Sequence, residues 1–412
     1  MTLTEPSLRR RKAAFIFIFM TVLLDMLALG VIIPVLPKLV LQFVEDNNTR
    51  AAEIYGLFST VWALMQFLFS PMQGALSDRF GRRPIILLSN FGLCFDYVLM
   101  AVAPSLLLLF VGRVMSGITA ASISTANAYI ADVTPPEKRA GAFGMMGVAF
   151  SVGFILGPAL GGVLAGYDLR LPFWAAAGLS LLNGLYGLIV LPESLPRENR
   201  APWRWRRANP IGSLKFLRSH ADLLGFATVS LLSGFAHTAL PTTLVLYLGY
   251  RYGWDERMIG LTMAVIGFST LIMQGGLIRP FVARFGERAA LYTGFSIGAL
   301  GFATIGLAPT GYWLWFGVTL LSCWGLAGAA VMALMTKHVQ PSEQGQLQGA
   351  NSSLMGIAAM IGPAIFTLSY AAAIDPKHGF DLPGVPFLLA AGFLLAAMFV
   401  GWRVLRRDHA GA

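Results

Sequence analysis

The sequence contains few charged residues and few of the side chains that build metal sites. Charged residues make up 12% of the 412 positions, about half the share of a soluble globular domain. The only two cysteines are Cys94 and Cys323, and the five histidines are scattered along the chain. These numbers and spacings exclude a disulfide framework and the usual zinc motifs. We therefore expect no metal and no cofactor.

Motifs of the common enzyme classes are also lacking. The sequence has no G-x-S-x-G motif, no Walker motif and no constellation of paired carboxylates that would suit catalysis. An ATP-driven pump needs a soluble nucleotide-binding domain, and the longest polar segment, residues 192–221, is too short for one. We therefore predict that the protein is not an enzyme.

Apolar residues, in contrast, are abundant. They make up 56% of the chain, and the mean hydropathy is +0.68. Many lie in runs of about 20 residues, the length that crosses about 30 Å of hydrocarbon. We predict an all-α protein that spans the lipid bilayer twelve times, at residues 13–36, 54–76, 84–103, 106–131, 140–166, 171–191, 222–248, 257–280, 288–308, 312–335, 344–370 and 385–405.

The chain contains an internal repeat. Arg79-Phe80-Gly81 recurs as Arg284-Phe285-Gly286, and Gly157-Pro158-Ala159 recurs as Gly362-Pro363-Ala364, at a shift of about 205 positions in each case. This repeat predicts two six-helix bundles, residues 1–191 and 222–412, joined by a cytoplasmic central loop at 192–221.

Basic residues show how the spans are oriented. The amino terminus and alternate connections hold 23 of the 30 Lys and Arg residues, and such segments lie on the cytoplasmic side. Both termini are therefore expected in the cytoplasm. This bias explains the net charge of +10, so we expect no nucleic-acid partner.

Three charged residues lie well inside the predicted spans, away from their ends: Asp25, Asp96 and Arg113. A charge at the centre of a membrane helix costs about 2.5 to 3.5 kcal/mol, so each is a candidate functional group. Counted along the helices, all three fall near one depth and can form one charged layer. A structural ion pair is the alternative, and Asp96 suits that role better. Asp25 suits proton exchange better, because Pro34 weakens its helix.

Polar and aromatic residues at eight further span positions are candidates for a substrate cavity. Each of them could instead serve only to pack helices together, and His237 could do either. The eight residues are Trp62, Gln66, Ser124, Asn127, His237, Gln274, Trp324 and Asn351.

Five segments of the chain resemble the major facilitator superfamily, and within it the drug:proton antiporters of the tetracycline type. They are LLDMLALGVIIPVLP at 23–37, GALSDRFGRRP at 74–84, FDYVLMA at 95–101, GRVMSGITAA at 112–121 and GFILGPALGG at 153–162. The resemblance implies a major facilitator fold with two pseudo-symmetric six-helix bundles.

The same resemblance implies roles for individual residues. Asp25, Asp96 and Arg113 match the family's proton-handling residues. A gating motif between helices 2 and 3 corresponds to Gly74, Asp78, Arg79, Gly81 and Arg82. An antiporter motif, in which small residues allow close packing between the halves, corresponds to Gly153, Gly157, Pro158, Gly161 and Gly162.

The second half departs from the tetracycline exporters, because Thr270 and Gly298 stand where those proteins place a histidine and an aspartate. We expect a monomeric exporter in a bacterial inner membrane that exchanges a small amphipathic compound, such as an antibiotic, for protons by alternating access. An uptake carrier for a metabolite or sugar is the first alternative. A non-transporting receptor or a channel is the second.

Overall fold

The computed structural model describes residues 5–120, 122–200, 217, 221–340, 343–379 and 381–410. Most of the predicted central loop therefore lies outside the described residues. Within them the chain is helical, without a strand. The helices are α1 Glu5–Ile32, α2 Leu36–Phe43, α3 Asn48–Phe80, α4 Arg82–Val102, α5 Leu106–Thr119, α6 Ser122–Val133, α7 Pro136–Ala165, α8 Leu171–Val190, η1 Arg197–Asn199, α10 Ala221–Tyr252, α11 Glu256–Ile272, the π-helix η3 Met273–Leu277, α12 Ile278–Leu307, α13 Gly311–Ser322, α14 Gly325–Lys337, α15 Gln344–Ile374, η5 Pro376–His378 and α16 Val385–Ala410.

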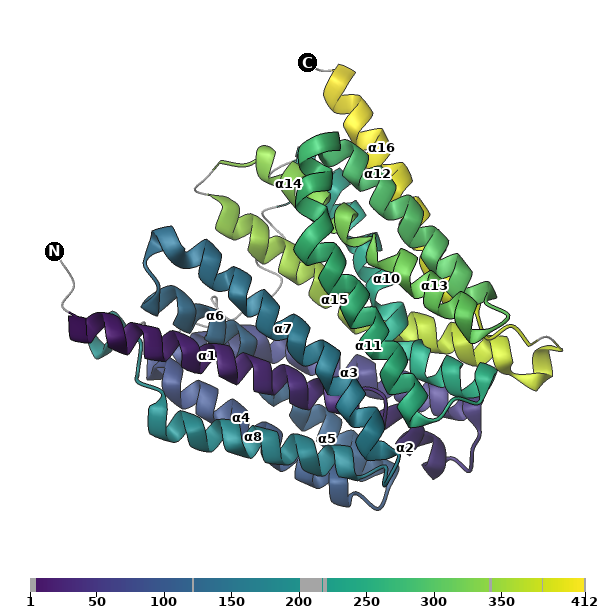
Figure 1. Ribbon diagram of the computed structural model, residues 1–412, viewed down its shortest axis with the longest axis horizontal. Helices are drawn as coiled ribbons and strands as arrows, with labels where there is room; N and C mark the ends of the chain where they lie inside the picture. The colour runs from purple at the N-terminus through teal and green to yellow at the C-terminus, as the bar shows by residue number, and fades with distance from the viewer. Residues whose placement is uncertain are drawn as a thin grey trace. The chain divides into compact units, whose positions relative to one another are not determined.

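Two compact units make up the chain. The first comprises Met1–Leu36 and Leu64–Asn209, and the second comprises Pro37–Ala63 and Pro210–Ala412. The ribbon in Figure 1 follows the helices from the amino terminus in purple to the carboxyl terminus in yellow. The sequence repeat places residues 37–63 in the first bundle, whereas the structure groups them with the second unit. The bundle boundaries at 191 and 222 stay a prediction.

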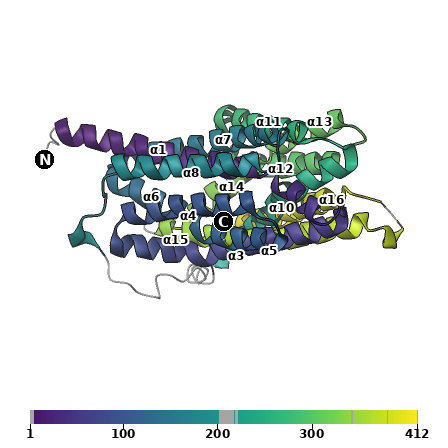
Figure 2. The ribbon, with the colours of Figure 1, turned by 90° about the horizontal axis from the view of Figure 1, so that it is seen from below.

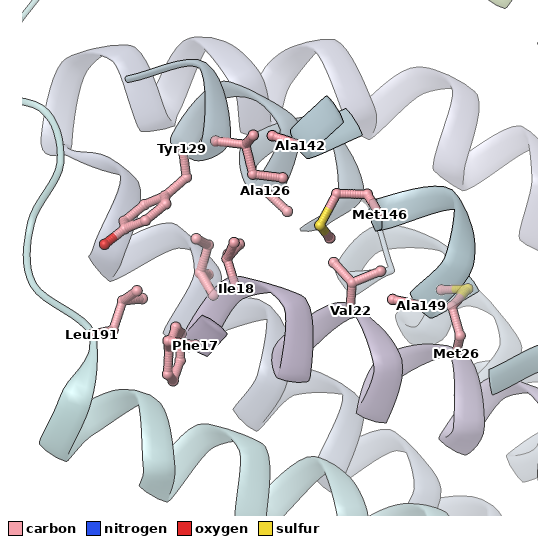
Figure 3. Close-up of a cluster of buried hydrophobic side chains, with 12 residues drawn as sticks. Phe17, Ile18, Val22, Met26, Ala126, Tyr129, Ala142, Met146, Ala149 and Leu191 are labelled. Atoms are coloured by element: carbon pink, nitrogen blue, oxygen red, sulfur yellow. The ribbon is translucent and has the colours of Figure 1, made fainter. Parts of the chain in front are cut away.

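In the first unit, α1 is the central helix. It packs against α7 and α8, and α8 packs in turn against α4; Figures 1 and 2 both show α1 and α8 side by side. A buried apolar cluster joins α1 to α6 and α7 (Figure 3), with Ile18 and Val22 from α1 facing Tyr129 and Met146, while Phe17 points to the opposite side of α1, toward α8. This packing holds the middle of α1, where Asp25 lies, in a defined position.

The second unit pairs its helices in the equivalent way. α10 packs against α15 and α16, and α12 packs against α13, α14 and α16. Residues 37–63 join this unit through polar contacts. Lys38 Nζ lies 2.8 Å from Glu256 Oε1 and donates to the Trp254 carbonyl at 3.1 Å, while the Tyr55 hydroxyl donates to the Pro241 carbonyl at 3.2 Å.

Eleven segments of the described residues are long and apolar enough to cross a membrane. One of them, Glu256–Leu307, is 52 residues long and covers two predicted spans, 257–280 and 288–308. Gly286 interrupts its helical backbone with a φ of 79° and a ψ of 168°, between those two spans. The all-α membrane class is confirmed, and the count of twelve spans stays a prediction.

The first membrane helix is broken near Pro34, where the sequence predicts a weakened helix. α1 ends at Ile32, residues 33–35 form a turn, and α2 begins at Leu36. Because Pro34 has no amide hydrogen, it cannot donate to the Gly30 carbonyl, which instead accepts from the Ile33 amide at 3.2 Å. The break lies two to three turns after Asp25.

Candidate functional site

The three charged residues predicted inside the membrane all lie in the first unit and are buried there. Asp25 on α1 is 6% exposed, Asp96 on α4 is 0% exposed and Arg113 on α5 is 8% exposed. All three act electrostatically on the hydroxyl of the buried Tyr97 on α4. The first helix and the consecutive helices α4 and α5 thus bring the three charges into one neighbourhood.

Asp96 and Arg113 lie on α4 and α5, which pack against each other. Gly112 makes this approach possible, because a Cβ at that position would lie 2.6 Å from Met100 Cγ and 3.1 Å from Asp96 Oδ1. A larger side chain would therefore push the two helices apart. This arrangement suits an acid held beside an arginine in a low-dielectric interior.

Asp25 has a partner that the sequence analysis missed. The Asn183 side chain on α8 donates from Nδ2 to Asp25 Oδ1 at 2.9 Å and to the Thr21 carbonyl at 3.1 Å. Asn183 is 0% exposed. An asparagine in the middle of an apolar run is the sequence signal that could have pointed to it.

A second charged cluster surrounds the gating motif at the junction of α3 and α4. Arg82 Nη1 lies 2.6 Å from Asp78 Oδ1 and donates to Ser77 Oγ at 2.7 Å. Its Nε lies 3.2 Å from Asp132 Oδ2 at the end of α6. One guanidinium therefore ties α3 and α4 to α6.

The segment after α8 joins the same cluster through Glu193. Its carboxylate accepts from the Arg82 backbone amide at 2.8 Å, and Arg200 Nη2 lies 3.9 Å away from it. Gly81 has a φ of 107°, a conformation that favours glycine. A Cβ at Gly81 would collide with the Glu193 carboxylate.

Three of the five predicted gating residues, Asp78, Gly81 and Arg82, are therefore brought together. Gly74 has open space around it, and Arg79 is exposed with its guanidinium 5.2 Å from the centre of the Phe80 ring. The partners Ser77, Asp132, Glu193 and Arg200 were missed by the sequence analysis. Asp132 and Glu193 both stand at the ends of apolar runs, which is the signal that was available.

The antiporter motif provides close packing between α7 and α1. Gly153, Gly157 and Gly161 lie one turn apart. A Cβ on Gly157 would lie 2.7 Å from Gly30 Cα, and a Cβ on Gly30 would lie 2.9 Å from Pro158 Cδ. Such small-residue contacts let two backbones approach closely in a membrane.

These described contacts lie within the first unit, so the expected packing between the halves stays a prediction. Gly162, the fifth residue of the motif, is buried, and its carbonyl accepts from the Gly166 amide at 3.2 Å. The motif thus fixes the position of α1 from Leu23 to Val31, the stretch that carries Asp25.

Two of the eight candidate cavity residues lie beside each other. The rings of His237 and Trp324 have centres 5.9 Å apart, and Trp324 Nε1 donates to Ser233 Oγ at 3.1 Å. The other six candidates are distributed over four other elements. They lie on α3 (Trp62, Gln66), α6 (Ser124, Asn127), η3 (Gln274) and α15 (Asn351).

Comparisons with known proteins agree with this arrangement. The family model described as Major Facilitator Superfamily matches residues 18–363, a range that contains the buried charges, the Arg82 cluster and the glycines of α7. The chain belongs to the major facilitator superfamily. Members of this superfamily are membrane transporters, which are not a class of enzymes.

Within the superfamily, the chain is similar to tetracycline resistance proteins. It is 38% identical to the class C protein of Escherichia coli over 366 residues, covering 89% of this chain and 92% of that protein. It is 34% identical to the class E protein of Escherichia coli, covering 95% and 94%. The resemblance read from the sequence motifs is confirmed.

A solved structure shares the fold. The crystal structure of the human organic anion transporter MFSD10 (TETRAN) matches with a TM-score of 0.70 and 25% identity, covering 95% of this chain and 99% of that one. The major facilitator fold predicted from the sequence is therefore confirmed.

Proposed function

We propose that this transporter exports a small amphipathic antibiotic in exchange for protons, and that its substrate is of the tetracycline class. The observation that carries the proposal is the group of three buried charges in the first unit, Asp25, Asp96 and Arg113. The names of the relatives supply the substrate class. A bacterial inner membrane, cytoplasmic termini and a monomeric state belong to the same proposal.

The proposed mechanism uses Asp25 as the group that takes up and releases the transported proton. Burial and a neighbouring guanidinium act on a carboxyl group in opposite senses, so a small change in surroundings can switch its protonation. Arg113 supplies the positive charge, and Asp96 keeps that charge balanced when Asp25 is neutral. Uptake of a proton from one side and its release on the other would drive the exchange.

Alternating access would move the two predicted bundles, 1–191 and 222–412, about a midplane site. In this proposal Arg82 and its partners act as the gate, because one side chain connects α3, α4 and α6. His237 and Trp324 line the substrate path together with the other six cavity candidates. The π-helix at Met273–Leu277 is a kind of distortion that is frequent at functional sites.

The experiment is drug accumulation in a host strain that lacks its own exporters. Cells expressing the protein should accumulate less tetracycline than empty-vector cells, and a protonophore should abolish the difference. A panel of chemically varied antibiotics in the same assay defines the substrate range. Higher accumulation in expressing cells, abolished by the protonophore, would instead establish the uptake carrier.

Inverted membrane vesicles separate a transporter from a channel or receptor. Addition of tetracycline to energised vesicles should release protons from the vesicle lumen, with a rate that saturates as the tetracycline concentration rises. Vesicles with Asp25→Asn at equal expression are the matched control. Flux that is neither saturable nor coupled to the gradient would contradict the proposal.

A further inference from the structure

The polar contact between α8 and α1 has no role in the mechanism above. Asn183 lies in the middle of α8 at 0% exposure, and Nδ2 donates to both Asp25 Oδ1, at 2.9 Å, and the Thr21 carbonyl, at 3.1 Å. Thr21 and Asp25 are one turn apart on α1, so the amide spans one turn of that helix.

The geometry defines which atom of the amide faces α1. A backbone carbonyl can only accept a hydrogen bond, so the Thr21 carbonyl requires the NH2 end of Asn183. The second hydrogen of that NH2 group is then available to Asp25 Oδ1. Phe17 stacks on Tyr186, with ring centres 4.8 Å apart, and holds α1 and α8 together on the cytoplasmic side of the contact.

The second unit shows that packing alone does not require this polar pair. Thr21-Val22 and Pro34 on α1 match Thr228-Val229 and Pro241 on α10, which aligns Leu232 with Asp25. Pro172-Phe173 and Gly187 on α8 match Pro386-Phe387 and Gly401 on α16, which aligns Ala397 with Asn183. α10 packs on α16 as α1 packs on α8.

The aspartate and the asparagine are thus both present in one repeat and both replaced by apolar residues in the other. Burying an unpaired amide costs about 1 to 3 kcal/mol, and asparagine is a poor helix former. An apolar side chain of similar size would pack α8 at lower cost. The presence of an asparagine at position 183 is therefore explained by its hydrogen bond to the Asp25 carboxyl group.

We infer that Asn183 is the positioning residue of Asp25, whose carboxyl it holds in one orientation for proton exchange. This inference rests on the proposed proton-coupling role of Asp25. Because Oδ1 faces the amide N–H, a proton that joins the carboxyl group is added at Oδ2. The bond to Oδ1 persists in both protonation states, since a carbonyl oxygen of the acid also accepts.

Other ionisable groups face the same region from the helices around it. Asp96 and Tyr97 on α4 and Arg113 on α5 interact electrostatically with one another. Tyr186 lies on α8, where it stacks on Phe17. On α6, the Tyr129 hydroxyl donates to the Pro192 carbonyl at 3.0 Å, and Asp132 pairs with Arg82, so both are engaged outside the Asp25 contact. The described side chains of α7 include no ionisable group. Any pH profile of Asp25 is therefore compared between variants that leave all of these groups intact.

Infrared difference spectroscopy of the purified full-length protein tests the inference without a substrate. Spectra taken between acidic and alkaline buffer should contain a protonated-carboxyl band that Asp25→Asn removes. Asn183→Leu keeps the side-chain size and removes the donor, so the band should change frequency and its pH midpoint should move by about one pH unit.

Ser180→Ala is the matched control, because Ser180 lies on the same helix at 1% exposure and its hydroxyl has no hydrogen-bond partner among the described residues. This variant should leave the band unchanged. Asn183→Thr retains a donor and serves if Asn183→Leu fails to fold; it should move the midpoint less than a full pH unit.

Two results would overturn the inference. A wild-type band and midpoint in a folded Asn183→Leu protein would show that Asn183 does not position the carboxyl group. An equal displacement in Ser180→Ala would show a general effect of altering α8. If Asp25→Asn removed no band, the coupling role of Asp25 would fall as well, whereas a failure to export tetracycline would leave this spectroscopic result standing.

Discussion

The ion pairs Arg82–Asp132 and Glu287–Lys337 occupy equivalent positions in the two repeats with their charges exchanged. Each member of the second pair follows its counterpart in the first by the repeat shift of about 205 positions. The nitrogen to oxygen distances are 3.2 Å in the first pair and 2.8 Å in the second. The first pair connects α4 to α6, and the second pair connects the equivalent helices α12 and α14. The connection is therefore kept although the charges are exchanged.

The surroundings of the two pairs differ far more than their distances. The Arg82 side chain is 10% exposed and also contacts Ser77 and Asp78, whereas the Glu287 and Lys337 side chains are 30% and 58% exposed. Desolvation strengthens a charge-assisted bond, and exposed pairs contribute little. The repeat therefore duplicates the backbone, whereas, among the described residues, the first copy surrounds a buried arginine with several charged partners and the second copy has an exposed pair at the equivalent position.

The neighbouring glycines show the same contrast. Gly81 and Gly286 both have positive φ, at 107° and 79°. Glu193 and Arg200 lie against Gly81, whereas a Cβ on Gly286 would meet nothing within 4 Å. One backbone turn is thus used twice, once inside a charged cluster and once in open space.

The largest expected effect tests whether coupling resides in the first unit alone. Asp25→Asn should abolish proton-coupled transport while expression is unchanged, because an amide cannot take up and release the proton. Leu232→Met, at the aligned position of the second unit, should keep coupling. Drug-driven proton release in inverted vesicles measures both, and uphill transport by Asp25→Asn would remove Asp25 from the mechanism.

The next effect separates the two ion pairs. Arg82→Gln leaves Asp78 and Asp132 without their charged partner, so turnover should fall by about tenfold or more while substrate affinity changes little. Glu287→Gln should change turnover by less than about threefold. Binding measured beside transport rate decides the question, and equal losses in the two variants would contradict the comparison.

A smaller effect, on thermal stability, is expected from substitution of the two aligned glycines, Gly81 and Gly286. Alanine at position 81 or 286 meets the same backbone strain, about 1 to 3 kcal/mol, but only Gly81→Ala also displaces the Glu193 carboxylate. Gly81→Ala should therefore lower the thermal unfolding midpoint more than Gly286→Ala. Adding Glu193→Ala to both backgrounds should reduce the difference. A difference that persists would assign the cost to something other than Glu193.

The smallest effect is expected for the exposed pair. Exchanging its charges in the double variant Glu287→Lys with Lys337→Glu should change stability by less than about 1 kcal/mol and leave transport near the wild-type rate. Each single variant should be slightly worse than the double. Thermal unfolding and vesicle transport check this, and a large loss in the double variant would show that the polarity of this pair matters.

Local patterns were enough to predict much of the fold and part of the site. Apolar runs indicated membrane helices because hydrocarbon requires length and apolarity that can be counted along the chain. Pro34 indicated a weak point in the predicted span 13–36, because a proline removes a hydrogen bond within its own helix, and the structure shows a full break there. Asp25, Asp96 and Arg113 were visible as charges in apolar runs.

Partners from distant segments were not predictable in this way. Asn183 lies 158 positions from Asp25, and Glu193 lies 111 positions from Arg82. Neither spacing follows a helical period, and an asparagine within an apolar run does not say which helix it faces. The contact between Lys38 and Glu256 was likewise invisible, since the sequence repeat assigns these residues to different halves.

The sequence by itself determined the membrane class, the repeat, the superfamily and the three buried charges, because each of these depends on residue type and on spacing within single helices. Only the tertiary structure decided that Asn183 holds Asp25, that Arg82 joins Asp78 to Asp132, and that the two repeated loops differ in their surroundings. Hydrogen bonds and ion pairs act over a few ångströms in space, and only helix packing brings the groups that form them together.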